Sequence, residues 1–345
     1  MISEKVKIFL AEIKKDLGFI PKDLHITRKA CALVAISYGR VIKIEEPKVC
    51  HCPLFTTLFS FETINKDTIE SKFNWQSEHW GMFTCHRKVC DEKIIVPFGA
   101  SEMIMYSLKK KSIDAAVIAC EGAGTVITAS PAVVQGIGAY MNGLFYTTPI
   151  PEVISRIEET GAVVLSPTDA TIDQFEGVRK AADLGYCRIA VTVRGDEQKT
   201  ITKIRKFEKE VKDKTNKDKF NIVTLTVCNT GISKEQAETI RDESDLAWAC
   251  ASRFIREIVG PGSILQVGMK IPVFVLTAKG LDFISSYSSD NFLKEKLKDA
   301  GRKHYITSNK FEEGAIKINM GKFSVFLYET RYLPIGTEDE PHPLV

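Results

Sequence analysis

Short apolar runs alternate with amphipathic stretches through the middle of this chain, between about residues 94 and 280. The runs Ile113–Cys120, Arg188–Val193 and Ile222–Val227 are rich in β-branched residues, which is typical of strands buried on both faces. Segments with helical spacing, such as 173–184 and 233–243, lie between them. The short connections predict an α/β fold with a mostly parallel, helix-covered sheet, Rossmann-like and doubly wound.

The two ends of the chain have a different pattern. Residues 3–17 predict an amphipathic helix, and Cys31–Ile36 and Arg40–Ile44 predict a β-hairpin. A second hairpin is predicted around Met320-Gly321. We therefore expect an N-terminal part over 1–93 with a helix, a hairpin and an irregular Cys/His segment, an α/β core over 94–285, and an extension over 286–345 with a helix and a hairpin.

The stretch 56–93 shows little periodicity. It contains several residues that bind metals or line sites, namely Trp75, His79, Trp80, Cys85, His86 and Cys90. A segment of this length without periodicity is uncommon in a compact domain, and it is often functional or held in place by a metal. The alternative is a mixture of helix and loop that covers an edge of the sheet.

Composition narrows the class of protein. The chain has 345 residues, of which 44% are hydrophobic and 26% charged, and its formal net charge is +3. This small charge gives no electrostatic case for nucleic acid or a membrane surface as the main partner. There is no apolar run of ~18 residues and no signal-peptide pattern, so we expect a cytoplasmic protein. In a reducing cytosol the nine cysteines are packing residues, metal ligands or reactive thiols.

Polar residues follow the predicted strands. If the strands are parallel, these residues share one edge of the sheet, where ligands bind in such folds. The loop from Gly122 through Gly124 to Thr125 permits close approach of the backbone to a ligand, but Ile127 stands where a dinucleotide fingerprint needs its third glycine. The alternative for Ser252 is a helix cap. The candidate ligand-binding residues are Gly122, Gly124, Thr125, Asn229, Thr230, Ser252 and Arg253.

The cysteines are candidates for metal ligands. Cys52, Cys85, Cys120 and Cys250 lie at predicted strand ends or in irregular segments, where packing does not require a thiol. Thiolates bind iron–sulfur clusters and also zinc, although the spacing here matches neither the zinc pairs nor the ferredoxin runs. The alternative is that all of them are buried packing residues.

Several stretches resemble the archaeal methanogenesis marker protein 8 family. The matching stretches, which occur in one order, are Cys52–Leu54, Cys120–Ile127, Val134–Gly138, Thr147–Ile154, Ile172–Val178, Thr230–Ser233, Ala249–Ser252, Ile255–Glu257, Leu265–Gly268 and Ile271–Pro272. The resemblance implies a cytoplasmic protein of methane-metabolising or related anaerobic archaea, in a family that occurs together with methyl-coenzyme M reductase.

These observations lead to three hypotheses. The first is an accessory protein of archaeal C1 metabolism that binds an iron–sulfur cluster, or zinc, and helps to mature or activate methyl-coenzyme M reductase. Its partners would be that enzyme or its assembly factors, with a homo-oligomer possible in principle. The second is an enzyme acting on a small anionic substrate, with Cys120 as nucleophile, Glu121 as acid/base and Arg253 as an anion clamp. The third is a binding module without chemistry.

Overall fold

The structure is a computed structural model of the chain. It describes residues 4–93, 96–139, 141, 143–215, 219–288, 293, 297 and 303–345. The helix expected after residue 286 lies mostly outside these residues. Within the described residues, no helix is long and apolar enough to cross a membrane.

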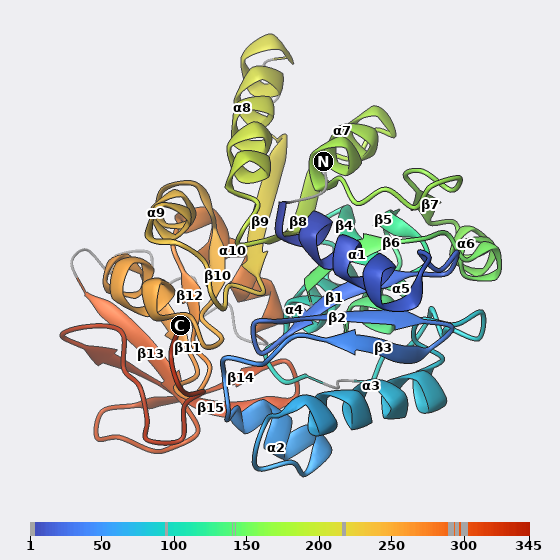
Figure 1. The fold of residues 1–345 in the computed structure, drawn as a ribbon. Coiled ribbons are helices and arrows are strands. Elements are labelled where there is room, and N and C mark those ends of the chain that lie inside the picture. The colour runs from blue at the N-terminus through green and yellow to red at the C-terminus, as the bar shows by residue number, and fades with distance from the viewer. Residues whose placement is uncertain are drawn as a thin grey trace.

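A mixed sheet of eleven strands runs through the molecule, in the order β14-β15-β13-β11-β12-β10-β9-β8-β4-β5-β7 (Figure 1). Its central strands β4, β8, β9 and β10 are parallel neighbours. The strands are β4 (Ala115–Cys120), β5 (Gly124–Thr128), β7 (Val163–Val164), β8 (Arg188–Arg194), β9 (Asn221–Val227), β10 (Leu246–Trp248), β11 (Leu265–Val267), β12 (Val273–Val275), β13 (His304–Ser308), β14 (Ile316–Met320) and β15 (Phe323–Thr330).

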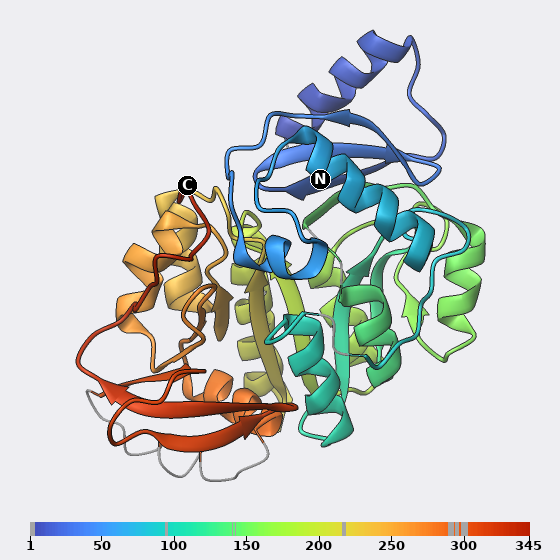
Figure 2. The same ribbon diagram turned by 90° about the horizontal axis from the view of Figure 1, so that it is seen from below.

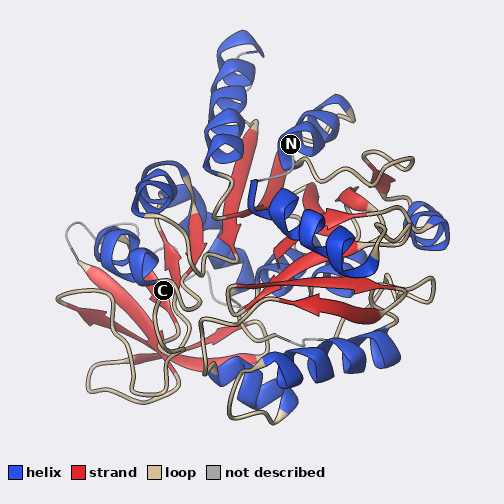
Figure 3. Cartoon of the chain, viewed as in Figure 1, coloured by secondary structure: helices blue, strands red, loops and turns tan. Residues whose placement is uncertain are grey.

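Helices cover both faces of the large sheet (Figure 3). On one face α4 (Ala100–Lys109), α5 (Pro131–Gly138), α6 (Pro151–Glu158) and α10 (Ala278–Tyr287) pack in one core with side chains such as Ile118 and Leu225. On the other, α7 (Gln174–Asp183), α8 (Gln198–Thr215), α9 (Lys234–Glu243) and the short helix η1 (Ile255–Val259) pack with Val117 and Val191. A second short helix, η2 (Gly260–Gly262), follows η1. Successive side chains of each strand thus enter opposite cores, as the period of a strand requires.

A second sheet has four strands in the order β3-β2-β1-β6, with β1 (His25–Lys29), β2 (Ala32–Ser37), β3 (Arg40–Ile44) and β6 (Gly143–Thr147). Figure 1 shows α1 (Glu4–Leu17) above this sheet and α3 (Lys66–Trp80) below it. Helix α2 (Pro53–Phe59) contributes to the same core as α3. The view from below shows α3 in front of this small sheet, and α2 on the side of it that is nearer to the large sheet (Figure 2). We call the small sheet with its three helices the N-terminal layer.

The α/β class and both terminal hairpins are confirmed, since β2 pairs with β3 and β14 with β15. The prediction of a mostly parallel sheet is wrong outside the four central strands. Six of the ten pairings between neighbouring strands in the described part of the sheet are antiparallel. The reason at β4 is the turn at Gly122 and Gly124, whose positive φ angles of 78° and 73° reverse the chain into an antiparallel hairpin with β5.

Two further predictions are corrected. The sequence pattern of residues 132–144 predicts a single helix, but α5 ends at Gly138, and Gly143–Thr147 forms β6, which pairs with β1 instead of joining the large sheet. The stretch 56–93 is not irregular throughout, because it contains the end of α2 and the whole of α3. The first difference arises because β6 pairs with β1, which is distant in sequence. The second arises because α3 has polar residues on its buried face, so its sequence lacks apolar periodicity.

Candidate functional site

The carboxyl ends of the parallel strands β4, β8, β9 and β10 meet at one edge of the large sheet. This geometry brings Cys120, Arg194, Cys228 and Cys250 to the same edge, because each ends one of these strands or follows it closely. Arg28 of β1 donates to the carbonyl of Cys228, so the N-terminal layer packs directly on this edge. The candidate site lies between the two.

Helix α3 directs polar side chains toward its buried face. Ile69, Lys72, Phe73 and Gln76 are all buried, and their i, i+3, i+4, i+7 spacing places them on one face of the helix. Two of these four inner positions hold polar residues, so the buried face of α3 does not show the apolar periodicity that predicts an amphipathic helix. Asn65 caps the helix, since its side chain accepts from the backbone N–H of Thr68.

Lys72 is a buried base without a hydrogen-bond partner. Its side chain is 2% exposed, and within the described residues its Nζ makes no hydrogen bond. Nζ lies 3.7 Å from the ring centroid of Phe73. Burial lowers the pKa of Lys72 well below its ordinary value of 10.5, the charge of Lys29 lowers it further, and Glu121 and Cys228 act in the opposite sense. These surroundings favour the neutral form of the amine.

Two neighbours of Lys72 also have unused polar groups. Both polar atoms of the Gln76 amide are buried without a partner, one turn further along α3. Lys29 ends β1 with its Nζ 4.9 Å from the ring centroid of Phe55, and it has no carboxylate partner in the described chain. Buried polar groups in native proteins are paired as a rule, so the Lys72 amine and the Gln76 amide need an explanation, whereas Lys29 is only half-buried.

Cys228 and Cys250 follow directly after β9 and β10, and both have left-handed backbone conformations with φ of 56° and 47°. This conformation costs an L-residue ~1–2 kcal/mol, and such strain concentrates at functional sites. Burial raises the pKa of Cys250 to about 12, and the neighbouring thiols of Cys228 and Cys52 add to the rise. Burial also raises the pKa of Cys228, against the charges of Arg28 and Arg194.

These interactions place three thiols and two lysines at one junction. Lys29 interacts electrostatically with Lys72, Cys228 and Cys250, and Lys72 with Cys228. We call the set comprising Lys29, Lys72, Gln76, Cys52, Cys228 and Cys250 the interlayer site. Cys52 is the N-cap residue of α2, and its side chain makes no capping hydrogen bond.

A cavity of about 120 Å³ adjoins the interlayer site. Cys228 lines it, together with Ile118 of β4, Thr192 and Arg194 of β8, and Gly143 of β6. Gly143 matters for this space, since a Cβ at that position would lie 3.6 Å from Sγ of Cys228. A single water needs only ~10–15 Å³ of such volume, so the cavity has room for several waters or a small metabolite.

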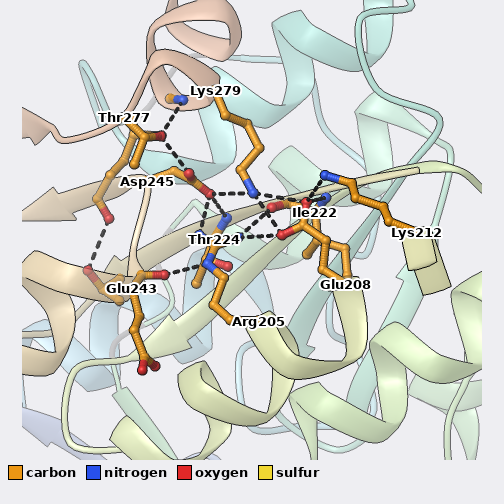
Figure 4. Close-up of polar contacts among 12 residues, drawn as sticks. Arg205, Glu208, Lys212, Ile222, Thr224, Glu243, Asp245, Thr277 and Lys279 are labelled. Carbon is orange, nitrogen blue, oxygen red and sulfur yellow. Dashed lines mark hydrogen bonds and ion pairs between the residues drawn. The ribbon is translucent and has the colours of Figure 1, made fainter. Parts of the chain in front are cut away.

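A network of buried charges at the opposite ends of β9 and β10 is paired, as Figure 4 shows. Lys279 donates to both carboxylate oxygens of Glu208, at 3.0 and 2.9 Å, and lies 3.5 Å from Asp245. Arg205 donates to Asp245 at 2.5 Å, and the Thr224 N–H donates to the same oxygen. This network holds α8, α10 and the two strands together. Lys72 differs from Lys279 in lacking partners.

The predicted catalytic pair, Cys120 and Glu121, lies at the same edge but is tied into the structure. Arg87 donates to Glu121 at 2.5 Å, and both side chains are fully buried. The Cys120 thiol donates to the Glu121 backbone carbonyl at 3.2 Å. Burial, and then the charge of Glu121, raises the pKa of Cys120 well above its ordinary value. A thiol held protonated in this way is a poor nucleophile.

The predicted ligand-binding residues mainly hold the backbone of this edge. Gly124 packs so closely that a Cβ there would lie 2.2 Å from the Ala170 carbonyl oxygen. The Thr125 hydroxyl donates to Gln174 at 2.8 Å, and the Asn229 amide donates to the carbonyls of Thr226 and Trp248. The remaining residues also make contacts within the protein. The Gly122 N–H donates to the Thr147 hydroxyl, Thr230 accepts from the Ala251 N–H, and Ser252 accepts from the Ile255 N–H. Arg253 forms an exposed ion pair with Glu257.

Of the predicted metal ligands, the structure brings together Cys52 and Cys250. Cys228, which reads from sequence as an ordinary strand residue, joins them. Cys120 interacts instead with Glu121 and Arg87, and Cys85 is exposed, with a carbonyl that accepts from Arg156 of α6. In the described part of the chain, no three His, Cys, Asp or Glu side chains are grouped closely enough to hold a metal ion.

The sequence analysis missed Lys29, Lys72, Gln76 and Cys228. One signal was available for two of them, because Lys72 and Gln76 share an i, i+4 register with Ile69 and Phe73 on a capped helix. The others depend on which strands become neighbours.

Comparison with known proteins gives two matches. Residues 25–287 match a family described as an uncharacterized protein conserved in archaea (DUF2099). A protein of Methanocaldococcus jannaschii named "Uncharacterized protein MJ0054" is 40% identical over 259 residues, which covers 75% of this chain and 88% of that protein. The family match includes the interlayer site. The finer resemblance to methanogenesis marker protein 8 stays a prediction.

Proposed function

We propose that the protein binds a small anionic ligand at the interlayer site. The chain belongs to the archaeal family DUF2099, whose description gives no reaction, so the proposal is argued from the site itself. The observation that carries the proposal is the buried amine of Lys72 without a hydrogen-bond partner. An isolated buried amine or ammonium is unfavourable by several kcal/mol unless a partner is present. A ligand would supply that partner.

Charge supports an anion as the ligand. Lys29 and Lys72 have no carboxylate partner in the described residues, whereas Glu121, the acidic group that interacts with Lys72, is already paired with Arg87. Arg194 at the edge of the cavity is likewise occupied, by Asp196 and Glu197. The unbalanced charge at the site is therefore positive. The unused amide of Gln76 could donate to one ligand oxygen and accept from a ligand hydroxyl.

Binding of an anion would change the protonation of Lys72. Burial and Lys29 lower the pKa of Lys72 in the free protein, so its amine is neutral above that lowered pKa. A bound anion favours the ammonium form, and binding therefore takes up a proton. The affinity should then fall as the pH rises through the interval between the lowered and the ordinary pKa.

The test is titration of the full chain, purified without oxygen, with malonate and with inorganic phosphate. Calorimetry in buffers of different ionisation enthalpy measures the affinity and the number of protons taken up. We expect saturable binding of at least one of these anions with proton uptake. Binding should be lost in Lys72→Met and weakened at least tenfold in Lys29→Met. Lys234→Met, a change at an exposed lysine of α9, is the control. No binding to wild type, or equal binding to all variants, would refute the proposal.

The electrostatic interaction of Cys250 with Cys52 and Cys228 motivates a second candidate, an iron–sulfur cluster or zinc held by these three thiols. This set replaces Cys85 and Cys120 of the sequence prediction. In the described structure the thiols are not grouped closely enough to hold a metal, so binding would require their side chains to move together. Burial raises the pKa of Cys228 and Cys250, so a metal would displace their protons on binding. Lys29 and Lys72 would then face the negative charge of the thiolates. If the protein holds such a centre, we propose that it acts as an accessory protein of methyl-coenzyme M reductase.

Iron, zinc and acid-labile sulfide in anaerobically purified protein test this second candidate. Metal that is lost in Cys228→Ser and Cys250→Ser but retained in Cys85→Ser would support it. Metal content that does not change in Cys228→Ser would remove the cluster hypothesis and leave the anion site. Co-purification of methyl-coenzyme M reductase with the tagged chain, and its loss in the same variants, would test the partner.

A further inference from the structure

We propose that Lys72 forms an imine with the carbonyl group of its ligand, so that the ligand is a small anionic aldehyde or ketone such as a 2-oxo acid. This inference rests on the proposed anion site and adds a chemical class and a reaction to it. The residue carrying the reaction is Lys72, with Lys29 holding the negative group.

The surroundings of Lys72 match those of reactive lysines. Lysine becomes a nucleophile at neutral pH when it is desolvated or placed next to another cation. Lys72 satisfies both conditions, being 2% exposed and close to Lys29. The Phe73 ring, 3.7 Å from Nζ, excludes water on one side. Its pKa is lowered by these surroundings, which keeps the amine in the unprotonated form that attacks a carbonyl.

A structural role does not account for this lysine. Lys279, the comparable lysine of the network in Figure 4, has its ammonium satisfied by Glu208 and Asp245. Lys72 has no such contact, so nothing in the described fold stabilises its polar end. Lys72 does not line the cavity itself; Cys228 lines it and interacts electrostatically with Lys72, so a ligand in the cavity would approach the amine past Cys228.

The reaction balances without an oxidant, a reductant or a co-reactant. The Nζ electron pair attacks the carbonyl carbon and gives a carbinolamine. The carbonyl oxygen then leaves as water with the two protons that the amine gives up, and a carbon–nitrogen double bond forms. Lys29 stays paired with the carboxylate of the ligand during both steps.

Reductive trapping tests the imine. The full chain is incubated with pyruvate or glyoxylate and cyanoborohydride, and adducts are located by intact mass and by peptide mapping. We expect one predominant adduct, on Lys72, at least tenfold faster than on exposed lysines. Lys72→Arg should lose it, whereas Lys234→Arg should retain it. Malonate, an anion without a reactive ketone or aldehyde, should protect Lys72 against labelling.

Lys29→Met separates recognition of the charge from reactivity of the amine. It should reduce trapping of pyruvate at least tenfold and reduce trapping of acetone, which has no charge, by a clearly smaller factor, because the charge of Lys29 also lowers the pKa of Lys72. Circular dichroism establishes that each variant is folded. Equal labelling of surface lysines in wild type and Lys72→Arg would overturn the imine. If malonate and pyruvate bind in a Lys72-dependent way but no adduct forms, the imine is refuted and the anion site stands. If no anion binds, both proposals fail.

Discussion

Lys72→Met should stabilise the protein near neutral pH, which is unusual for a change at a fully buried residue. Methionine has nearly the same length and needs no hydrogen-bond partner, so it can fill the space between Phe73 and the sheet edge. The change removes an unpaired buried polar group whose cost is ~1–3 kcal/mol on mutational scales. We therefore expect the free energy of unfolding to rise by about 1–3 kcal/mol.

The pH dependence provides a second, independent magnitude. The pKa of Lys72 is lowered in the folded protein, so over the interval below 10.5 the unfolded chain binds one more proton than the folded one. Stability then increases with pH, and it is lost as the pH falls through the folded pKa, with a slope of up to ~1.4 kcal/mol per pH unit. The gain from Lys72→Met should accordingly shrink between about pH 7 and about pH 10.

Lys279→Met is the matched comparison. It removes one cationic partner of Glu208 and Asp245, two nearly fully buried carboxylates with which Arg205 still pairs. Complete loss of the partner of a buried ion costs ~3–5 kcal/mol. Because Arg205 remains and the Lys279 side chain is 22% exposed, we expect a loss at or below the lower end of this range. The two substitutions of buried lysine by methionine should thus have opposite signs.

Urea unfolding, followed by circular dichroism and tryptophan fluorescence at several pH values, measures both effects. A loss of 2 kcal/mol or more in Lys72→Met, about the cost of removing a satisfied buried group, would show that Lys72 has a structural partner. That result would contradict the reasoning behind both the anion site and the imine. A higher free energy of unfolding in Lys279→Met would show that the ion pairs of Lys279 in Figure 4, which Lys72 lacks, do not determine the sign of the effect on stability.

Three further predictions concern the frame of the molecule. Arg87→Met should lower the free energy of unfolding by ~3–5 kcal/mol in urea denaturation, because it leaves Glu121 buried and unpaired, whereas Arg241→Met in the exposed pair with Asp242 should change it by under ~1 kcal/mol. Gly124→Ala should prevent folding or cost more than ~2 kcal/mol, since φ is +73° and the new Cβ would meet the Ala170 carbonyl, and unchanged expression and melting temperature would contradict it. Burial raises the pKa of Glu102 from 4.5 to about 7. The free energy of unfolding that Glu102 contributes below pH 4.5 should therefore fall by about 3 kcal/mol as the pH rises to 7. Urea midpoints across this range should show that fall in wild type and lack it in Glu102→Gln.

Local pattern was sufficient to predict most elements of the core. The strands ending at Cys120, Arg194 and Val227 were evident as β-branched apolar runs, and they are parallel neighbours. The caps at Ser130, Asp173 and Ser233 also form, each accepting from a backbone N–H three residues on. These features depend on residues close together in sequence, where periodicity and capping chemistry act.

The direction of strands beyond the core could not be predicted in the same way. The spacing of Gly122 and Gly124 suits a loop before a helix as well as a hairpin, and only packing against Ile150 and Ala170 decides between them. The pairing of β6 with β1 joins residues more than a hundred positions apart, so no local signal specifies it. The sheet is mixed for this reason.

The candidate site depended on the same long-range packing. Cys120 and Cys228 both end buried strands, and the sequence does not say which thiol faces the N-terminal layer. The left-handed backbone at Cys228 and Cys250 turns those two toward each other and toward Lys29, whereas the Cys120 thiol lies against Glu121. The sheet edge was therefore predictable as a location, but its chemistry was not.

Several unfavourable features of this fold meet where the N-terminal layer contacts that edge. Two cysteines have strained backbones, an amine lacks a hydrogen-bond partner, and an amide has both polar atoms unused, all within the interlayer site. At Arg205 and Lys279, by contrast, buried charge is paired. Replacing Lys72 by methionine would remove one such cost by a single substitution, so we infer that the amine interacts with a group outside the described residues. A partner that satisfies the amine, the amide and the charge of Lys29 together must carry both negative charge and hydrogen-bonding oxygen atoms.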